Sequence, residues 1–447
     1  MVTFIADKQT LEDLNISGKY NKNSIFSVFN NTRTRGGEQL LENMFQNPLS
    51  DAQEINQRAG IFRYFQQKEI VFPFEKSLLD IVEGYISRTC PNNRLLALLH
   101  IYRQKCLYSI ARDKELEITL VGCQGAIDFL GKLKDFLVQI PDFPDISRYV
   151  ATLDMITCML ENEKLDIFQE KVIDEKFSLA RLSQYDYIFR CVCSEHIKQM
   201  IHLVYLLDVY IAVGKVAREK QFSVAHALPK LLKGNNISIE NLFHPQLFQP
   251  IPNSIRIDSE KNVIFLTGAN MSGKSTLIKS LGIAVYLAHM GFPVAAQKME
   301  FTLQDGIYTS INMPDNLSEG YSHFYAEVMR IKKIAQEVSP SKNFLILFDE
   351  LFKGTNVKDA YDATVALMEA FASIHNCSYL ISSHISESGN ALKERCTSIK
   401  FHYFPTTMEN NIPRYSYQLQ TGISNDCYGM MIIRNEHILD ILNDTTE

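Results

Sequence analysis

The pattern of hydrophobic and polar positions divides the chain into two parts with different periodicity. From Ser77 to Lys220 the apolar residues recur mostly at helical spacing, as they do between Leu95 and Tyr102. After Gly234, which opens a turn-rich joint, short apolar runs alternate with helical patterns. Such alternation is typical of a parallel sheet covered by helices. The pattern therefore predicts a mainly helical domain followed by an α/β domain.

The helical part contains one unusually long uninterrupted run. Between Tyr187 and Lys220 the sequence has no proline and a single glycine, Gly214. One helix of that length would extend roughly 50 Å at a rise of about 1.5 Å per residue. The run therefore predicts either a lever-like rod or two helices. Its aromatic and methionine residues are expected to be packing residues.

The first fifty residues are polar and rich in asparagine. Residues 30–37 at their centre have a loop-like composition, and a helical pattern follows them. Asp51 is predicted to cap the next helix, because Glu54 stands three residues later as in a capping box. The basic side chains of Arg33 and Arg35 fit a solvated loop and a partner-binding loop equally well.

Five short apolar runs in the second part predict strands. Val263–Thr267, Phe344–Phe348 and Ser378–Ser382 have the composition of buried parallel strands. Ile399–Tyr403 and Tyr415–Leu419 alternate apolar and polar residues on either side of a proline-containing loop. The last two are therefore predicted to form an antiparallel pair at the edge of the sheet.

A glycine-rich loop follows the first of these strands. Its pattern is Gly268-x-x-x-x-Gly273-Lys274-Ser275, and a helical run begins at Leu277. The glycines let backbone N–H groups face phosphate oxygens, Lys274 supplies positive charge to the β- and γ-phosphates, and the Ser275 hydroxyl can bind Mg²⁺. The N-terminus of the helix adds a favourable dipole. The loop therefore predicts a site for nucleotide phosphates.

Polar residues follow two later strands. Asp349 and Glu350 end the run Phe344–Phe348, and His384 follows Ser378–Ser382. At the carboxyl edge of the sheet these side chains would lie beside the glycine-rich loop. Asp349 would hold Mg²⁺ through water, Glu350 would polarise the attacking water, and His384 would sense the γ-phosphate or orient water. The alternatives are solvated acids at a strand end and a structural histidine.

A second anion-binding turn is predicted before a helix that begins at about Tyr325. Ser318, Gly320 and Ser322 offer hydroxyl and backbone N–H groups near that helix start. Because the glycine-rich loop already surrounds one side of the phosphates, this turn is expected to serve the nucleotide of a neighbouring subunit. The alternative is an ordinary helix cap.

Composition limits the classes of protein that fit. The chain has 447 residues, of which 46% are hydrophobic and 21% charged, as in ordinary soluble globular proteins. The net charge of −6 offers no support for nucleic acid binding, although a local basic face is compatible with it. No apolar run is expected to span a membrane, and the start does not resemble a signal peptide. The nine scattered cysteines are interpreted as reduced thiols of a cytosolic protein without structural zinc.

Taken together, these motifs resemble the MutS family of DNA mismatch-repair ATPases. Residues 267–276 resemble the family's Thr-Gly-Pro-Asn-Met-Gly-Gly-Lys-Ser-Thr, and Asn270-Met271 separates them from other phosphate loops. Residues 349–355 resemble Asp-Glu-Ile-Gly-Arg-Gly-Thr, and Ser383-His384 resembles Thr-His. Residues 34–58 are similar to the opening of the family's core domain.

The resemblance implies an ATPase that uses ATP and Mg²⁺. It implies that Glu350 and His384 assist hydrolysis and that Ser275 and Asp349 hold the metal. The residues implied to contact ATP are Gly268, Ala269, Asn270, Met271, Ser272, Gly273, Lys274, Ser275, Thr276, Ser318, Gly320 and Ser322.

The resemblance also implies the organisation and the partners of the chain. Residues 1–235 would form a helical core and lever domain, 236–430 an ABC-ATPase-like P-loop domain with a mostly parallel sheet, and 431–447 a short tail. Nucleotide state would change the lever domain of a cytoplasmic protein in DNA repair or DNA-structure binding. The expected assembly is a homodimer with composite ATP sites, without a membrane partner.

Departures from the family pattern modify this expectation. The chain is expected to lack the mismatch-reading and connector domains, to have a reduced DNA clamp, and to recognise DNA structure rather than mismatches. Pro250 stands where the family often has an adenine-stacking aromatic, and Phe248 is the candidate substitute. The alternative function is a nucleotide-gated binding module or adaptor for branched DNA, the ribosome or a protein partner, with little turnover. A transporter-type ATPase is a further rival, against which Asn270-Met271 argues.

Overall fold

The computed structural model describes most of the chain and divides it into two compact units. The described residues are 4–17, 23–89, 93–144, 146–163, 165, 178–230, 235–311, 323–339, 341–352, 355–409 and 412–424. Unit 1 comprises Met1–Asn30, Met44–Gln67 and Val213–Glu447, and unit 2 comprises Asn31–Asn43 and Lys68–Ala212. The units are thus interleaved along the chain. A domain boundary at 235/236 stays a prediction.

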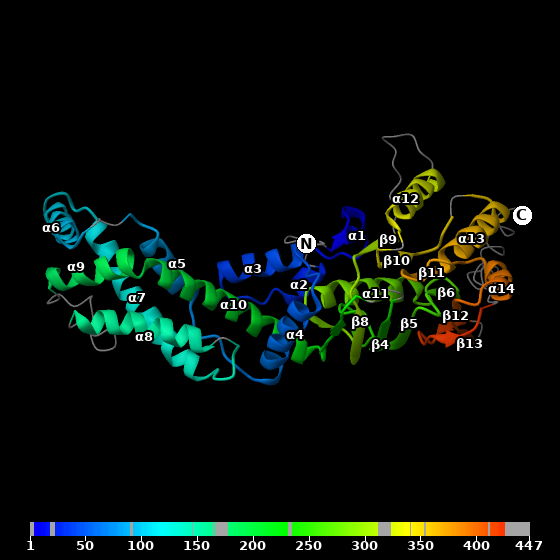
Figure 1. Cartoon of the computed structure of the whole chain (residues 1–447), viewed down its shortest axis with the longest axis horizontal. Helices are drawn as coiled ribbons and strands as arrows, with labels where there is room; N and C mark the ends of the chain where they lie inside the picture. The colour runs from blue at the N-terminus through cyan, green and yellow to red at the C-terminus, as the bar shows by residue number, and fades with distance from the viewer. Residues whose placement is uncertain are drawn as a thin grey trace, which may run out of the picture. The chain divides into compact units, whose positions relative to one another are not determined.

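A seven-stranded sheet forms the centre of unit 1 (Figure 1). Its strand order is β1-β9-β10-β11-β6-β12-β15, and every neighbouring pair is parallel except β12 with β15. The mostly parallel sheet confirms the predicted fold class, while the ABC-ATPase-like arrangement stays a prediction. The strands are β1 (Ile5–Ala6), β6 (Val263–Gly268), β9 (Gly306–Ser310), β10 (Phe344–Phe348), β11 (Ser378–Ser382), β12 (Ile399–Phe404) and β15 (Gln420–Thr421).

The register of the parallel strands brings three chain segments to one edge of the sheet. Phe348 of β10 pairs with Ile381 of β11, and Ser382 of β11 pairs with Leu266 of β6. The residues that follow these three strands therefore leave the sheet side by side. This edge carries the glycine-rich loop after β6 and the predicted polar residues after β10 and β11.

Helices cover both faces of this sheet. Side chains of Ile346 and Phe348 pack in one core with Ile334 of α12 (His323–Glu337) and Met368 of α13 (Val357–Ala372). Leu347 points to the opposite face because successive side chains alternate along a strand. There it packs on α11 (Lys274–His289), at Gly282, where an added Cβ would lie 2.8 Å from Leu347 Cδ1. Helix α14 (Ser386–Arg395) follows β11.

Among the described strands, three smaller sheets complete unit 1, and two of them are built from strands that flank β6 in sequence. β3 (His226–Leu228), β8 (Lys298–Thr302), β4 (Ile237–Leu242) and β5 (Asn253–Ile257) form one in the order β3-β8-β4-β5. β2 (Ser223–Val224) pairs with β7 (Pro293–Val294). The turn after β4 leads to the cavity described below.

The predicted antiparallel pair of 399–403 with 415–419 was wrong. β12 pairs in parallel with β6, and its antiparallel neighbour is β15. Residues 406–415 instead form a separate hairpin of β13 (Thr406–Glu409) and β14 (Ile412–Tyr415). The backbone cannot continue as a strand through Tyr417, whose φ is +54°. Asn253 holds this segment, since its side chain bonds Tyr417 O (2.9 Å) and Leu419 N (2.6 Å).

The N-terminal segment belongs to the α/β unit rather than to a polar, loop-like region. β1 adds a parallel strand to β9, and α1 (Lys8–Asp13) and α2 (Ile25–Phe29) follow. Asp13 accepts hydrogen bonds from Thr309 Oγ1 (2.7 Å) and Ile311 N (3.0 Å). The predicted cap of the next helix is confirmed, because Asp51 Oδ1 accepts the N–H groups of residues 53 and 54 at the start of α4 (Ala52–Gln67).

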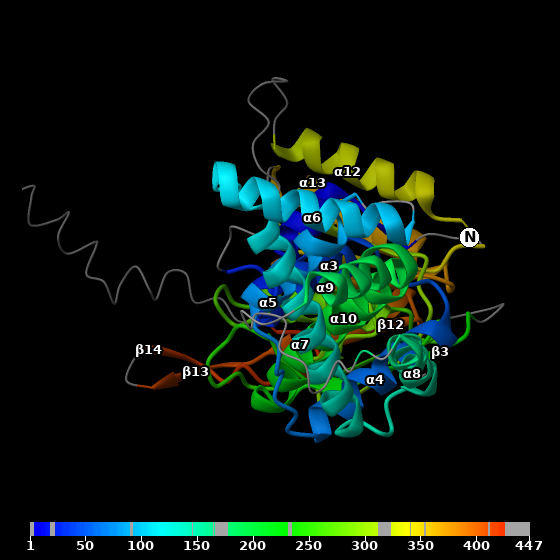
Figure 2. The same ribbon diagram turned by 90° about the vertical axis from the view of Figure 1, so that its left-hand side faces the viewer.

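Unit 2 is helical, as predicted, and Figure 2 shows its helices lying against one another. α7 packs against α5, α6, α8 and α9. The helices are α5 (Lys76–Ile86), α6 (Arg94–Ala111), α7 (Glu115–Val138), α8 (Ile146–Asn162) and α9 (Leu179–Tyr187). Two further helices, α3 (Arg35–Gln46) and α10 (Ser194–Glu219), contain residues of both units.

The run from Tyr187 to Lys220, predicted as a lever-like rod or as two helices, contains one long helix, α10, and a π-helical turn that separates it from α9. α9 ends at Tyr187, a π-helical turn spans Ile188–Val192, and α10 starts at Ser194. Buried Arg190 and Asp186 form an ion pair at this turn, and Tyr85 donates its hydroxyl to Asp186 at 2.9 Å. The break therefore coincides with a buried polar cluster that the sequence pattern does not reveal.

The predicted loop at residues 30–37 was wrong in its second half, where α3 starts at Arg35. Asp208 of α10 accepts the N–H groups of Arg33 (3.0 Å) and Thr34 (2.8 Å), and Thr34 Oγ1 accepts the N–H of Gly37 (3.0 Å). These side chains satisfy backbone groups at the helix start. The backbone at Arg33 is thus part of a helix cap, whereas partner binding by its side chain stays a prediction.

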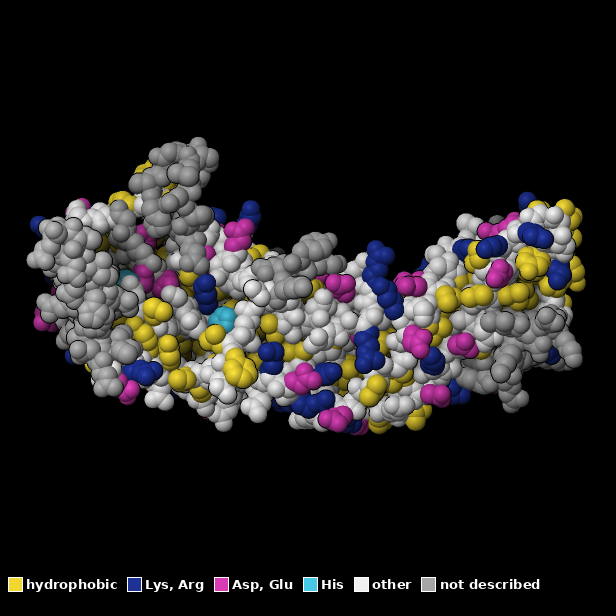
Figure 3. Space-filling view, turned by 180° about the vertical axis from the view of Figure 1, so that it is seen from behind, with side chains coloured by type: hydrophobic (Ala, Val, Ile, Leu, Met, Phe, Trp, Pro, Cys, Tyr) yellow, Lys and Arg dark blue, Asp and Glu magenta, His cyan; other side chains and the backbone are white. Residues whose placement is uncertain are grey.

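The apolar face expected on α6 is only partly buried. Ala97 and Ile101 are in the core, whereas Leu95, Leu99 and Ile110 are 73%, 62% and 85% exposed. Figure 3 shows exposed hydrophobic side chains together with Lys and Arg over this part of unit 2. Helical spacing of apolar residues therefore does not by itself identify a buried face here.

Among the described residues one helix, α10, is long and apolar enough to cross a membrane by length and composition alone. Of its most apolar window, 78% is buried inside the structure, as in a core helix.

The expectation of reduced thiols fails at Cys191, which is disulfide-bonded, because sequence spacing does not show which thiols meet. The free cysteines of the described part are Cys106, Cys123, Cys158, Cys193, Cys377 and Cys396.

Buried His289 at the end of α11 makes stability depend on pH. Its Nδ1 donates to Leu49 O (3.0 Å) and its Nε2 accepts from Gln304 N (3.2 Å), which leaves a neutral ring. Burial lowers the pKa of His289 from 6.5 to about 4. The unfolded chain therefore binds the extra proton first, so the free energy of unfolding should fall as the pH drops from 6.5 to 4, by up to about 3 kcal/mol from this residue.

Chemical denaturation of the wild type and of His289→Gln across this pH window measures that effect. The variant should lose less stability on acidification, although its stability at pH 7 is lower. Burial and the charge of Lys279 also lower the pKa of His244, to about 4, and this second contribution is common to both proteins. Equal pH dependence in the two proteins would contradict the assignment.

Candidate nucleotide-binding site

The glycine-rich loop connects β6 to α11 in a conformation that its sequence permits. Gly268 and Gly273 have φ angles of +138° and +108°, which side chains with a Cβ rarely adopt. Met271 also has a positive φ, +65°, and its side chain is 81% exposed. Gly273 is the N-cap of α11, so the first N–H groups of the helix are available at the end of the loop. This is the geometry that binds an anion.

Lys274 lies inside the loop. Its side chain is buried, and Nζ donates to the carbonyl oxygens of Gly268 (2.7 Å) and Ala269 (2.9 Å). Nζ also lies 3.9 Å from Glu350 Oε1. The loop therefore holds the ammonium group at its centre, next to the carboxylate that follows β10.

Three hydroxyl groups complete the loop. Ser275 and Thr276 are exposed and line a cavity, whereas Ser272 is buried. The Ser272 hydroxyl has no hydrogen-bond partner within the described part of the chain. Because a buried hydroxyl without a partner costs about 1–3 kcal/mol, this atom favours a polar ligand in the loop. Asn270 is exposed at the tip.

The residues after β10 and β11 meet at the same place. Ser382 Oγ donates to Asp349 Oδ1 (2.6 Å) and accepts the N–H of Glu350 (2.9 Å). His384 Nε2 contacts Glu350 Oε1. Asp349 and Glu350 are largely buried, whereas His384 is partly exposed. The structure therefore brings Lys274, Asp349, Glu350 and His384 together around one sheet edge.

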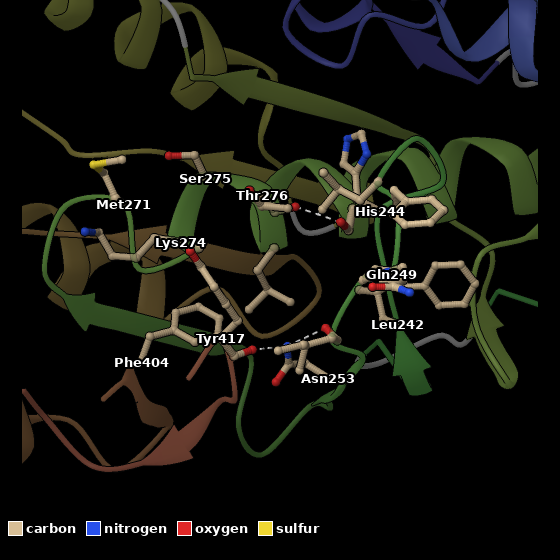
Figure 4. Close-up of a pocket in the computed structure, with 18 of the residues that line it drawn as sticks. Leu242, His244, Gln249, Asn253, Met271, Lys274, Ser275, Thr276, Phe404 and Tyr417 are labelled. Atoms are coloured by element: carbon tan, nitrogen blue, oxygen red, sulfur yellow. Dashed lines mark hydrogen bonds between the residues drawn. The ribbon is translucent and has the colours of Figure 1, made fainter. Parts of the chain in front are cut away.

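A cavity of about 590 Å³ extends from the loop. Figure 4 shows Lys274 and Met271 at one end of it and His244 and Gln249 at the other. The lining residues outside the loop are Leu242, Phe243, His244, Leu247, Phe248, Gln249, Pro250, Ile251, Asn253, Leu277, Ser280, Glu350, Phe404 and Tyr417. A charged end and an apolar, partly aromatic end suit a molecule with phosphates and a flat ring.

Sequence reasoning missed two groups of this cavity. Tyr417 comes from the segment before β15, and its Cδ1 would lie 3.3 Å from a Cβ on Gly273. His244 lines the cavity near the end of β4, and burial keeps it neutral at pH 7, with a pKa of about 4. Phe248, the candidate for stacking on adenine, lines the cavity, and so does Pro250. Phe248 is 90% exposed. No local motif marks Tyr417, since the fold brings it there from a distant segment.

The residues predicted to hold Mg²⁺ supply only part of its ligands, and phosphate oxygens and water would supply the rest. In the part of the chain that the structure describes, no group of three or more His, Cys, Asp or Glu could hold a metal ion. The Asp349 carboxylate and the Ser275 hydroxyl are hard oxygen donors, and Mg²⁺ commonly takes one or two such ligands beside water and phosphate oxygens. The donors present thus fit Mg²⁺ that arrives with a phosphate ligand. The predicted second turn, Ser318, Gly320 and Ser322, lies outside the described residues.

The strand, glycine-rich loop and helix at the edge of a parallel sheet define a domain of the P-loop type. Two family descriptions match the chain in sequence order, "MutS domain III" over residues 9–213 and "MutS domain V" over residues 264–443. Together they cover most of it, and the chain belongs to the MutS family.

Curated relatives agree with this family. The DNA mismatch repair protein MutS of Petrotoga mobilis is 27% identical over 62% of this chain and 32% of its own length. That of Streptococcus sanguinis is 32% identical over 45% of this chain and 23% of its own length. That of Pseudothermotoga lettingae is 22% identical over 99% of this chain and 65% of its own length. The chain thus spans from about a quarter to two thirds of the relatives it matches.

Proposed function

We propose that the chain is a MutS-type ATPase that binds and hydrolyses ATP with Mg²⁺ and transmits its nucleotide state to the helical unit, in DNA repair or DNA-structure binding. The observation that carries the proposal is the cluster of Lys274, Glu350 and His384, which come from three segments of one sheet edge. Lys274 and Glu350 line a single cavity, and His384 contacts Glu350.

ATP would bind with its phosphates in the glycine-rich loop and its base in the apolar end of the cavity. The loop N–H groups and Lys274 would neutralise phosphate charge, and Ser275 and Asp349 would hold Mg²⁺. When bound, Mg²⁺ supplies further charge neutralisation to the phosphates. The rings of Tyr417 and Phe248 offer apolar surface to a base.

Hydrolysis would rest on Glu350. Its carboxylate can accept a hydrogen bond from water and so orient that water toward the γ-phosphate. His384 contacts the same carboxylate and would fix its orientation. Lys274 would exchange its bonds to the loop carbonyls for bonds to phosphate oxygens. Glu350, whose Oε1 lies 3.9 Å from Lys274 Nζ, would then stand close to the reacting group.

Transmission of the nucleotide state would use the helices that belong to both units. α3 and α10 each contain residues of both, and a helix is stiff over its length. DNA is proposed as a partner because the relatives are named as DNA mismatch repair proteins. The proposed assembly is a homodimer in which each subunit completes the ATP site of the other, and the proposed location is the cytoplasm.

Two measurements on the purified chain test this function. Equilibrium binding of a fluorescent ATP analogue, with and without Mg²⁺, should saturate, and phosphate release should follow steady-state kinetics. Absence of binding at millimolar ATP would overturn the proposal. Saturable binding without turnover, with and without DNA, would favour a nucleotide-gated adaptor instead.

Affinity for homoduplex, mismatched and branched DNA at two salt concentrations then tests the DNA partner. If the contacts are to phosphates, affinity should fall steeply with salt, because counterions are released on binding. Binding to none of these DNAs in any nucleotide state would contradict a role on DNA while leaving the ATPase intact.

A further inference from the structure

The turn that carries Glu350 has an unfavourable backbone conformation. Glu350 and Phe352 both have positive φ angles, +57° and +63°, although neither is glycine. This conformation is unfavourable for a residue with a Cβ, so the surrounding structure must hold it in place. Because the φ angle of Glu350 sets the direction of its side chain, whatever holds this turn also aims the carboxylate.

Two buried acceptors hold backbone N–H groups of this turn. Ser382 Oγ accepts the N–H of Glu350 at 2.9 Å, and Glu327 Oε1 accepts the N–H of Phe352 at 2.8 Å. Glu327 is 4% exposed and lies in the first half of α12. The Phe324 ring, one turn earlier in α12, packs 5.9 Å from the Phe352 ring.

Helix α12 is itself anchored, so Glu327 has a fixed base. Arg330, one turn after Glu327, is buried and donates to the carbonyl oxygen of Thr309 from both Nε (2.9 Å) and Nη2 (2.7 Å). It also pairs with Asp7 of the N-terminal segment, with Nη2 to Oδ1 at 3.0 Å. Lys333 bonds the same carboxylate at 3.0 Å. The N-terminal segment and β9 thus fix α12, and α12 fixes the turn.

We infer that Glu327 is a positioning residue for hydrolysis, which acts by holding the Phe352 N–H and thereby aiming the Glu350 carboxylate. Glu327 does not line the cavity, and its contact with the turn is through the backbone. Without this acceptor the strained turn would relax toward negative φ angles and Glu350 would leave its place beside Lys274. The inference rests on the proposed ATPase function.

Three variants separate this role from a merely structural one. Glu327→Gln keeps an oxygen that can accept the Phe352 N–H, whereas Glu327→Ala removes it. Lys332→Ala changes an exposed residue of the same helix and is the matched control. We expect Glu327→Ala to lower kcat by at least about tenfold with the Kd for ATP changed by less than about threefold, because the loss falls on the transition state. Glu327→Gln and Lys332→Ala should stay within about threefold of the wild type in kcat.

Hydrogen exchange of the peptide that contains residues 349–352, without nucleotide, gives a readout independent of activity. Exchange there should be faster in Glu327→Ala than in the wild type and Glu327→Gln. If Glu327→Ala does not fold, Asp7→Asn replaces it, because this change loosens the anchor of α12. Asp7→Asn should also speed the exchange of residues 349–352 and lower kcat, but by less. Unchanged exchange and kcat in Glu327→Ala, or equal losses in Glu327→Gln, would overturn the inference. A wild type without turnover but with the expected exchange would instead contradict the proposed function alone.

Discussion

Replacing Lys274 by alanine is expected to weaken ATP binding by about 10- to 100-fold, whereas Glu350→Gln should leave binding nearly unchanged and slow turnover by about 100- to 1,000-fold. Lys274 lies at the centre of the loop, and a lost charge-assisted hydrogen bond costs about 1.5–3 kcal/mol of binding. Glu350 would act on water mainly in the transition state, so its loss appears in kcat. Titration with a fluorescent ATP analogue and a phosphate-release assay measure the two effects.

Matched controls for these variants come from the surface of the same unit. Lys298→Ala removes an exposed lysine and Glu260→Gln an exposed glutamate, and both should bind and hydrolyse ATP as the wild type does. If Lys274→Ala binds ATP with wild-type affinity and Glu350→Gln turns over normally, the site is misassigned. A loss of binding in Glu350→Gln would instead show that its contact with Lys274 organises the loop.

The centre of the α/β unit could be predicted from the sequence because its signals are local. Three buried strands have apolar runs that end at polar residues. The glycine-rich pattern of the loop after β6 is rarely found outside phosphate-binding loops. Parallel pairing then brings Lys274, Asp349, Glu350 and His384 to one edge without further information. The identity of the site follows from short segments, each of which is readable alone.

The rest of the site depends on contacts between distant segments. β1 joins the sheet beside β9 although it is only two residues long, because the edge of β9 is available for pairing. Tyr417 lines the cavity from a distant segment, and the Asn253 side chain bonds its backbone carbonyl. Glu327 meets Phe352 through the packing of α12 on the sheet. The periodicity of each segment does not show which distant segment it contacts.

The division into units also depends on long-range packing. The periodicity change after Gly234 predicts a domain boundary there, which stays a prediction. Compactness groups residues 44–67 and the N-terminal segment with residues 213–447. Buried contacts such as the bond from Tyr286 to the carbonyl oxygen of Phe45 (2.6 Å) account for this. Alternation of helices and strands along the chain does not show where a helix packs.

A shared active site is the second large expected effect. Lys274 and Glu350 border the cavity, and its described lining includes no arginine that could approach the γ-phosphate from the open side. The segment that contains Ser322 is predicted from sequence to supply an anion-binding turn to a partner's ATP. In a two-fold dimer each subunit would then complete the other's site. ATP would stabilise such a dimer, because it binds the associated form.

A mixing experiment tests this arrangement. Ser322→Arg alone and Lys274→Ala alone should each be inactive, because every site in either homodimer carries a defect. Mixed in equal amounts, half of the dimers should be heterodimers with one intact site, built from Lys274 of one subunit and Ser322 of the other. Activity should therefore recover to about a quarter of the wild type if subunits exchange at random.

The control mixture is Lys274→Ala with Glu350→Gln. Both residues are in the same subunit's part of the site, 3.9 Å apart, so their heterodimers contain no intact site and should stay inactive. Recovery in the first mixture and not in the second would locate Ser322 across the interface from Lys274, because exchange of subunits is common to both. Sedimentation with and without ATP supplies the second readout. A chain that stays monomeric in ATP, with turnover independent of its concentration and no recovery in either mixture, hydrolyses ATP within one subunit and contradicts the shared site.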